Sequence, residues 1–214
     1  RQRQMCIRDR QLVVRGYNDG FAFCYKIPEG EGECVNVQSE LTAYNFAGDY
    51  TAWFYNGENH NIGPEKLTET DGTRLPVMTV KAGDRHYMAI HEACLETGAP
   101  LVLQSKGGES LFSVASKPAD LSPGYTSAWR VVLYGTTPGV LTDSHLLELL
   151  NPDPDSRYDF SWVKPGLAVW DWRINGAVWD GFTYGMSYPS WIRMVDFAAE
   201  QGFKYLVLDA NWYG

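Results

Sequence analysis

A proline- and aspartate-rich stretch at residues 151–155 (NPDPD) divides the chain into two parts with different patterns. Proline lacks a backbone N–H and disfavours helix in the residue before it, so such a stretch is typical of a boundary between domains. Before it, short apolar segments alternate with turn residues. After it, a strand-length apolar segment is followed by a helix-length one and by a second strand. We therefore predict a domain over residues 11–155, and a linker and second segment over residues 156–214.

The first part has the pattern of an antiparallel β-sandwich. The pair Asp19-Gly20 predicts a hairpin between strands at residues 12–17 and 21–27. Turn signals also precede strands expected at residues 77–80 and 86–91. The other expected strands are residues 35–37, 101–104, 111–115 and 129–134. Short strands separated by frequent turns favour a sandwich. Asp143 is the expected N-cap of a leucine-rich helix that Asn151 closes.

The second part predicts a strand, a crossover helix and a strand. Residues 167–172 and 205–208 have the apolar character of buried strands. The helix between them is expected to start near Tyr188 and to stop at Gly202. Its apolar side chains at helical spacing are expected to form the buried face; they are Trp191, Ile192, Val195 and Ala199. Such a βαβ unit implies parallel pairing, and a complete (β/α)₈ barrel needs about 250 residues. We expect a truncated barrel.

Residues 1–10 carry four arginines and are expected to be a tail that does not belong to the fold. A secretory signal would continue into 7–15 apolar residues, and only residues 12–14 qualify. The alternative is a frayed basic arm. Beyond this tail, Cys24, Cys34 and Cys94 lack the spacing of a zinc site and are expected to be buried free thiols, the alternative being a disulfide.

Charge and composition exclude several classes of protein. Twenty-six acidic residues against 18 basic ones give a net charge of −8, whereas a nucleic-acid or anionic-membrane partner calls for a basic face. No apolar run approaches the 18 residues of a membrane-spanning helix. An aromatic content of 14% is too high for a disordered chain. A globular protein without a membrane span is expected.

Carboxylates follow both strands of the second part, and tryptophans flank them. Asp171 and Asp209 come after the strands, and the neighbouring indoles are Trp170, Trp172 and Trp212. Functional groups of a parallel barrel lie at these strand ends. Acids handle protons in glycoside hydrolysis, and flat rings pack against sugars, so this set is a candidate substrate-binding site. The alternative is that the acids only fix the barrel rim by hydrogen bonds and that the tryptophans are core.

Glu92 is the second candidate. A period of two places Glu92 on the face of its strand that holds Met88 and Ile90. A carboxylate among apolar side chains is costly unless it is paired or binds a metal ion. The alternative is that the strand has ended and Glu92 is solvated. Ca²⁺ prefers oxygen ligands, but it takes six to eight of them, so one carboxylate does not make a site.

Several motifs together resemble glycoside hydrolase family 97. They are residues 128–132 (AWRVV), 159–166 (DFSWVKPG), 169–172 (VWDW) and 195–209 (VDFAAEQGFKYLVLD). Residues 17–25 (YNDGFAFCY) and 90–93 (IHEA) are similar to the N-terminal domain of that family. The resemblance extends over residues 12–214, and the block 159–209 is the specific part.

The resemblance implies a mainly β chain: an N-terminal β-super-sandwich, followed by the truncated start (β-α-β) of a catalytic (β/α)₈ TIM barrel. It implies an exo-acting α-glucosidase or α-galactosidase of the bacterial periplasm or exterior, which binds Ca²⁺ and an oligosaccharide with a terminal α-glucosyl or α-galactosyl residue. Glu92 would be a calcium ligand. The catalytic carboxylates would come from later barrel strands, so none is expected in this chain, and Asp171 and Asp209 would be rim residues.

Two other functions remain open from the sequence. One is a sandwich module that binds carbohydrate or a partner without chemistry, through a patch formed by Trp53, Tyr55 and Trp129. The other is an α-galactosidase of a different barrel family, suggested by the spacing of Asp209 and Trp212.

Overall fold

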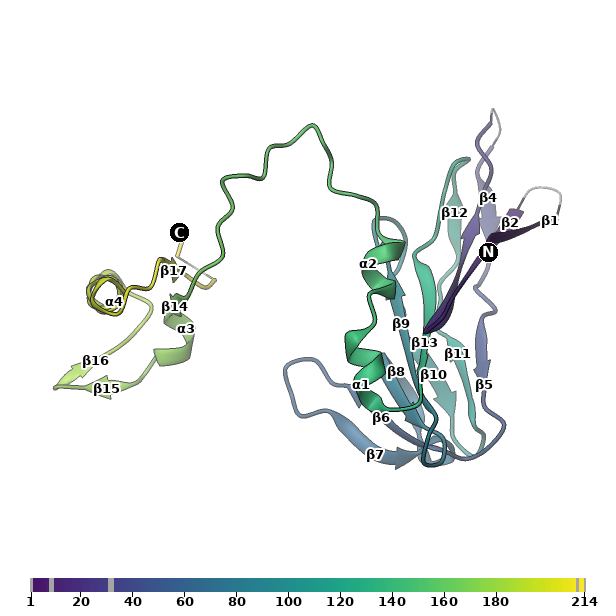
Figure 1. The fold of residues 1–214 in the computed structure, drawn as a ribbon, viewed down its shortest axis with the longest axis horizontal. Coiled ribbons are helices and arrows are strands. Elements are labelled where there is room, and N and C mark those ends of the chain that lie inside the picture. Colours follow the sequence, from purple (N-terminus) through teal and green to yellow (C-terminus); the bar gives the residue numbers. More distant parts are fainter. Residues whose placement is uncertain (1, 8–9, 31–32, 211, 214) are drawn as a thin grey trace. The chain divides into compact units, whose positions relative to one another are not determined.

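The computed structural model describes residues 2–7, 10–30, 33–210 and 212–213, which form two compact units (Figure 1). Unit 1 spans Arg1–Asp153 and unit 2 spans Pro154–Gly214, so the division falls within the stretch 151–155. Over the described ranges, no helix has the length and apolar character needed to cross a membrane.

Unit 1 consists of antiparallel strands and short helices. Its strands are β1 (Gln2–Ile7), β2 (Arg10–Tyr17), β3 (Gly20–Lys26), β4 (Val35–Val37), β5 (Ala43–Asn45), β6 (Thr51–Tyr55), β7 (Ile62–Lys66), β8 (Asp71–Lys81), β9 (Tyr87–Ala93), β10 (Leu103–Lys106), β11 (Leu111–Val114), β12 (Ala119–Leu121) and β13 (Trp129–Gly135). Its helices are the 3₁₀ turn η1 (Leu67–Glu69), α1 (Pro138–Asp143) and α2 (Leu146–Leu150). The mainly β fold predicted from the sequence is confirmed.

The main sheet has the strand order β1-β2-β3-β13-β9-β8-β10-β11-β5, and β6 pairs with both β7 and β8. Strand β8 changes partner along its length: Asp71–Arg74 pairs with β10, and Met78–Lys81 pairs with β9. A strand shared in this way turns a corner between two layers. The sheet therefore folds over on itself as a sandwich, and β12 and β4 form a small separate pair.

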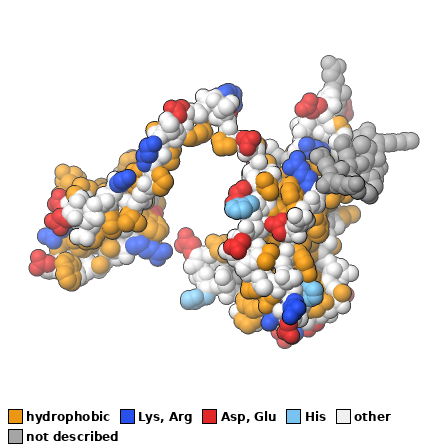
Figure 2. Space-filling model, in the orientation of Figure 1, with side chains coloured by type: hydrophobic (Ala, Val, Ile, Leu, Met, Phe, Trp, Pro, Cys, Tyr) orange, Lys and Arg blue, Asp and Glu red, His pale blue; other side chains and the backbone are white. Residues whose placement is uncertain are grey.

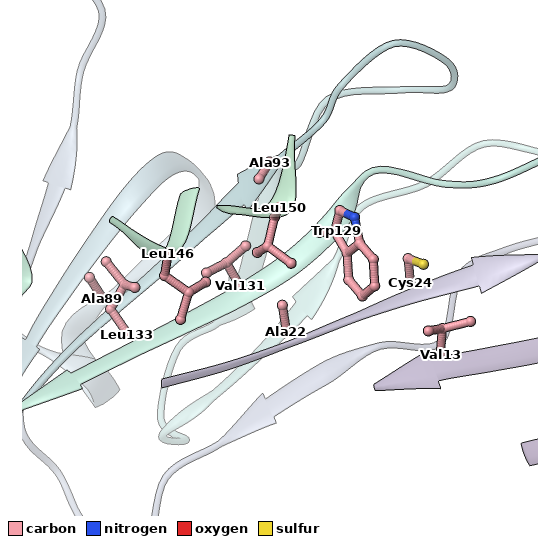
Figure 3. Close-up of a cluster of buried hydrophobic side chains, with 10 residues drawn as sticks. All are labelled: Val13, Ala22, Cys24, Ala89, Ala93, Trp129, Val131, Leu133, Leu146 and Leu150. Atoms are coloured by element: carbon pink, nitrogen blue, oxygen red, sulfur yellow. The ribbon is translucent and has the colours of Figure 1, made fainter. Parts of the chain in front are cut away.

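Two apolar clusters fill unit 1, and strand β9 contributes to both. On one face, Ala89 and Ala93 pack with β2, β3, β13 and the α2 leucines Leu146 and Leu150 (Figure 3). On the other face, Ile90 packs with side chains of β6, β8, β10 and β11, including Phe54 and Phe112. Because β9 is covered on both sides, its side chains are held between two cores.

Unit 2 contains the predicted parallel pair. Its elements are β14 (Ala168–Trp170), α3 (Asp171–Ile174), β15 (Val178–Trp179), β16 (Phe182–Thr183), α4 (Tyr188–Gln201) and β17 (Tyr205–Val207). β14 and β17 run parallel, with Trp170 opposite Val207, so the βαβ unit is present. Gly202 ends α4 with a φ of 73°, a left-handed conformation that glycine adopts without strain.

The buried face of α4 differs from the prediction. The buried side chains are Ser190, Met194 and Ala198, whereas Ile192 and Val195 are exposed. Tyr205 and Val207 of β17, expected to be buried, are exposed as well. One helix and two short strands cover only part of one another's apolar surface, and Figure 2 shows hydrophobic side chains gathered on the outside of this unit.

Local details of unit 1 also depart from the predictions. The β2–β3 hairpin turns at Asn18 and Asp19, one residue before the expected pair, because Tyr17 pairs with Gly20. Asp143 ends α1 instead of capping α2, and the Ser144 hydroxyl accepts the Leu146 N–H instead. Strands β5, β6, β7 and β12 were not predicted. All four are three to five residues long.

Part of the segment that the sequence set outside the fold belongs to the main sheet. Residues 2–7 form β1, which pairs with β2 from Gln2 opposite Arg15 to Ile7 opposite Arg10. Residues 1, 8 and 9 of that tail lie outside the described residues. Of the free cysteines that the structure describes, Cys24 is buried as expected, Cys94 is half-buried and Cys34 is exposed.

Candidate functional site

An arginine and two glutamates form an ion-paired cluster inside unit 1. Arg130 of β13 lies directly opposite Glu92 of β9 in the antiparallel register. Its Nη1 lies 3.3 Å from Glu92 Oε2. Glu40, between β4 and β5, accepts a two-pronged pair of bonds, from Nε to Oε1 at 2.9 Å and from Nη2 to Oε2 at 2.7 Å. We call Glu40, Glu92 and Arg130 the interior triad.

Glu92 is part of its strand and is not solvated. β9 continues to Ala93, and the Glu92 side chain is 11% exposed. Besides the Arg130 contact, Glu92 Oε2 accepts the backbone N–H of Leu101 at 2.8 Å. The solvated alternative is therefore wrong, and the cost of burying the acid is offset by an ion pair and a backbone hydrogen bond.

The triad carries more negative than positive charge. Two carboxylates face one guanidinium, and the Arg130 side chain is only 5% exposed. Burial acts to lower the pKa of Arg130, but the hydrogen bond and charge of Glu40 outweigh it, and the pKa lies above its usual value. Nearby, burial raises the pKa of Tyr44, whose hydroxyl is buried with no hydrogen-bond partner among the described residues. The surplus carboxylate makes this region favourable for a cation.

The Glu92 carboxylate fits a calcium ion only as one ligand of a larger coordination shell. In the ranges that the structure describes, no three or more His, Cys, Asp and Glu side chains cluster to hold a metal ion. Both recorded bonds of the Glu92 carboxylate end on Oε2, and no described residue donates a hydrogen bond to Oε1. Glu92 can thus supply one oxygen of the six to eight that Ca²⁺ takes.

A cavity of about 820 Å³ opens beside the triad. Glu40 and Arg130 line it together with Tyr25 and Tyr125, and most of its other walls are apolar. The Tyr25 hydroxyl is bonded to the Thr42 hydroxyl at 2.8 Å. The cavity could admit a small molecule or a segment of another chain to the edge of the triad.

The two acids of unit 2 lie together at the ends of the parallel strands. Asp171, in the first turn of α3, is 0% exposed, and its Oδ1 accepts the Asp209 N–H at 3.0 Å. Its Oδ2 accepts the indole N–H of Trp191 at 2.8 Å. The Asp209 carboxylate accepts the indole N–H of Trp170 at 2.8 Å. Both acids are thus held by N–H donors within the unit.

The three tryptophans of the predicted sugar site are exposed. Trp170, Trp172 and Trp212 all have more than a third of their surface accessible, so they are not core residues in this chain. The guanidinium of Arg173 lies 5.1 Å from the Trp170 ring centre. The structure brings Trp170, Asp171 and Asp209 together by hydrogen bonds, and leaves aromatic faces beside them.

Sequence reasoning missed two members of the interior triad. Arg130 stands in an otherwise apolar strand, which is itself the signal of a paired buried charge. Glu40 belongs to no periodic pattern, so its position beside Arg130 becomes visible only in the folded structure. Of the aromatic patch considered for a binding module, Trp129 is in the core beneath Arg15, at 4.6 Å from its guanidinium, so that patch does not form as expected.

Comparison with known proteins gives a consistent result. Residues 2–152 match the model of the glycosyl hydrolase 97 N-terminal domain. A retaining alpha-galactosidase of Bacteroides thetaiotaomicron is 27% identical over 248 residues, covering 96% of this chain and 37% of the relative. A probable retaining alpha-galactosidase of Streptomyces bingchenggensis is 32% identical over 221 residues, covering 94% of this chain and 31% of the relative. The chain spans about a third of the length of these curated relatives.

Solved structures agree. A glycoside hydrolase family 97 enzyme of Pseudoalteromonas sp. strain K8, in complex with acarbose, superposes with a TM-score of 0.77 at 25% identity, covering 96% of this chain and 34% of that one. A variant of the same enzyme was solved with panose. A beta-arabinopyranosidase at 18% identity, covering 95% of this chain and 36% of its own, has a TM-score of 0.74 and shares the fold.

Proposed function

The chain belongs to glycoside hydrolase family 97, and we propose that it forms part of a calcium-dependent, exo-acting enzyme that removes terminal α-linked glucose or galactose from oligosaccharides. The names of the curated relatives, both alpha-galactosidases, support galactose, and the acarbose and panose complexes of the Pseudoalteromonas enzyme support glucose. The same resemblance supports a periplasmic or secreted enzyme.

We assign no catalytic carboxylate to this chain. The observation that carries this is the hydrogen bonding of Asp171, which is fully buried and uses both oxygens on N–H donors of its own unit. A general acid or nucleophile must reach the glycosidic oxygen or the anomeric carbon of a bound sugar. Asp171 has no surface with which to do so. It orders the ends of the first two strands of a proposed barrel, and the catalytic pair would lie on later strands.

The residues of this chain would act by binding and positioning. The exposed faces of Trp170, Trp172 and Trp212 suit the C–H faces of a pyranose ring. Glu92 would hold one coordination position of Ca²⁺, with the remaining ligands from the barrel. A bound Ca²⁺ would supply positive charge to the site.

Assays on aryl α-glucosides and α-galactosides test the proposal, with CaCl₂ or EDTA in the buffer. The 214-residue chain is expected to show no turnover above buffer, whereas a protein that joins this chain to a complete barrel is expected to hydrolyse one of the two, and EDTA is expected to abolish hydrolysis. Turnover by the 214-residue chain would show that its own carboxylates are catalytic. Activity of the longer protein unaffected by EDTA would overturn the calcium dependence.

The cavity beside the triad favours one alternative, a carbohydrate-binding module without chemistry. Its volume of about 820 Å³ and its two tyrosines, Tyr25 and Tyr125, suit a disaccharide. Isothermal titration of the 214-residue chain with maltose or melibiose distinguishes the two functions. Binding that is lost in Tyr125→Ala would support the binding module. If no heat of binding is measured, the module is excluded and the chain is interpreted as part of an enzyme.

A further inference from the structure

We infer that Arg130 and Glu40 are positioning residues for Glu92: they hold its carboxylate with Oε2 engaged and leave Oε1 as the oxygen that binds a divalent cation. The inference rests on the proposed function for the role of the cation. Its first part, the fixing of Glu92 by Arg130 and Glu40, concerns contacts within unit 1 and stands on their geometry.

Glu92 is held from two directions at one oxygen. Arg130 approaches Oε2 from the neighbouring strand β13 at 3.3 Å, and the Leu101 N–H reaches the same atom at 2.8 Å from the segment before β10. Leu101 is itself buried in the second apolar cluster, so this donor cannot move freely. Two fixed donors on one oxygen restrict the rotation of the carboxylate and distinguish Oε1 from Oε2.

Glu40 in turn fixes the guanidinium of Arg130. Nε and Nη2 of Arg130 bond both oxygens of Glu40, and the remaining nitrogen, Nη1, is left for Glu92. The Glu40 segment is held by its own backbone N–H, which donates to the Ser116 hydroxyl at 2.7 Å, and by the Thr42 hydroxyl, which donates to Glu40 Oε1 at 2.8 Å. A planar guanidinium bound in this two-pronged way has one orientation, which an ammonium group does not provide.

The charges explain why both residues are needed. Arg130 balances one of the two carboxylates, and it lies between them, so each glutamate is shielded from the other. Without Arg130, two nearly buried carboxylates would be unpaired, and the more favourable state would have Glu92 turned toward water. Partners that orient a metal ligand commonly change metal affinity by 10- to 100-fold when they are replaced. The same range is expected here.

Amide hydrogen exchange and ¹³C NMR of the 214-residue chain test the positioning without any metal. In Arg130→Met and in Glu40→Gln, the Leu101 amide is expected to exchange at least 10-fold faster, and the Glu92 Cδ resonance to shift. Arg130→Lys is expected to rescue neither signal fully, because it lacks the two-pronged geometry. Arg74→Met is the matched control, since it breaks a similar pair with Glu65 at 3.3 Å elsewhere in unit 1.

The outcomes separate positioning from general loss of structure. Protection of the Phe112 amide, in the apolar core, reports whether each variant is folded. If Arg130→Met fails to fold, Glu40→Gln tests the positioning of Glu92 instead, because it removes a charge at nearly constant volume. Unchanged Leu101 exchange and an unchanged Glu92 resonance in a folded variant would overturn the inference, as would equal changes in Arg74→Met.

Titration with CaCl₂ tests the second part. The initial slope of the Glu92 Cδ shift against CaCl₂ concentration is expected to fall 10- to 100-fold in Glu40→Gln relative to the unchanged chain. An equal slope in the two proteins would overturn the link between positioning and cation binding. No response of Glu92 in the unchanged chain would overturn its role as a cation ligand within this chain, while the Leu101 data still decide the positioning.

Discussion

The side-chain carboxylate of Asp171 accepts the backbone N–H of Asp209 at 3.0 Å, which ties together the ends of the two parallel strands of unit 2. Asp171 follows β14 and Asp209 lies two residues beyond β17. The contact gives the acids after the two strands a structural role, because the carboxylate of Asp171 orders the backbone that carries Asp209.

Replacing Asp171 is expected to destabilise unit 2. Asp171→Ala leaves the Trp191 indole N–H and the Asp209 N–H without their acceptor, and hydrogen bonds to a charged group contribute about 1.5–3 kcal/mol each. We expect a loss of about 3 kcal/mol in the free energy of unfolding of unit 2, measured by near-UV circular dichroism in urea. Asp180→Asn, at an exposed hairpin turn, is the control and should change it by less than about 0.5 kcal/mol.

Helix α4 allows a direct test of which face is buried. Met194 is 4% exposed, and Met194→Ala is expected to cost about 2–3 kcal/mol through lost burial and a residual cavity. Ile192, which the sequence pattern placed in the core, is exposed, so Ile192→Ala is expected to cost less than about 0.5 kcal/mol. Urea unfolding of both variants gives the comparison, and a larger loss for Ile192→Ala would contradict the structure.

The α4 result shows which part of the fold could be predicted from local pattern. Its start near Tyr188 and its stop at Gly202 depend on residues next to the ends, and both agree with the structure. The buried face depends on what packs against the helix, and here only a small unit does so. The corner in β8 and the short strands β5 and β12 depend likewise on contacts that are distant in sequence.

In the candidate site, too, the local pattern predicts one part, and contacts that are distant in sequence determine the rest. Strand periodicity placed Glu92 on the apolar face of β9 together with Ile90, and the structure shows it paired there. Its partner Arg130 is 38 residues away, and Glu40 is 90 residues from Arg130. Pairing across such separations depends on strand order, which local pattern does not encode, so the pattern left open whether Glu92 is paired or solvated and named no partner for it.

Unit 1 is expected to lose stability below neutral pH because of His91. Burial lowers the pKa of His91 below its usual 6.5, with Glu92 acting weakly in the opposite direction, and the Nδ1 atom is buried without a partner among the described residues. The unfolded chain therefore takes up a proton more readily than the folded one, and stability present above pH 6.5 falls as the pH drops toward the folded pKa.

Urea unfolding at pH 7.5 and pH 5.5 measures this effect. The free energy of unfolding is expected to differ less between the two pH values in His91→Gln than in the unchanged protein. His60→Gln, at an exposed position, is expected to leave that difference unchanged. An equal pH dependence in the unchanged protein and in His91→Gln would show that other groups cause it.

The cysteines are expected to react with DTNB in an order set by exposure. Cys34 is exposed and should react first, whereas burial raises the pKa of Cys24 and so lowers its thiolate fraction. Cys94 is half-buried, and burial raises its pKa as well, so it should react at an intermediate rate. Mass spectrometry of labelled peptides, in a Cys6→Ser background, identifies each site. Labelling of Cys24 before unfolding would contradict its burial.

Unit 2 is expected to make the 214-residue chain self-associate. Its exposed apolar side chains include Leu167, Val178, Trp179, Ile192, Val195, Phe197 and Val207. β14 and β17 pair only with each other among the described residues, so their outer edges have unpaired backbone groups. Exposed strand edges next to apolar surface favour association between chains.

Unit 1 provides the comparison, because it contains two buried clusters of its own. A chain ending at Asp153 is therefore expected to fold and to sediment as a monomer, whereas the 214-residue chain is expected to sediment with a weight-average mass that rises with concentration. Replacing Trp179, which is 75% exposed, together with Ile192 by serine should reduce that rise without affecting unit 1. A strictly monomeric 214-residue chain at about 100 μM would contradict the prediction, since an apolar surface of this extent without a partner drives association.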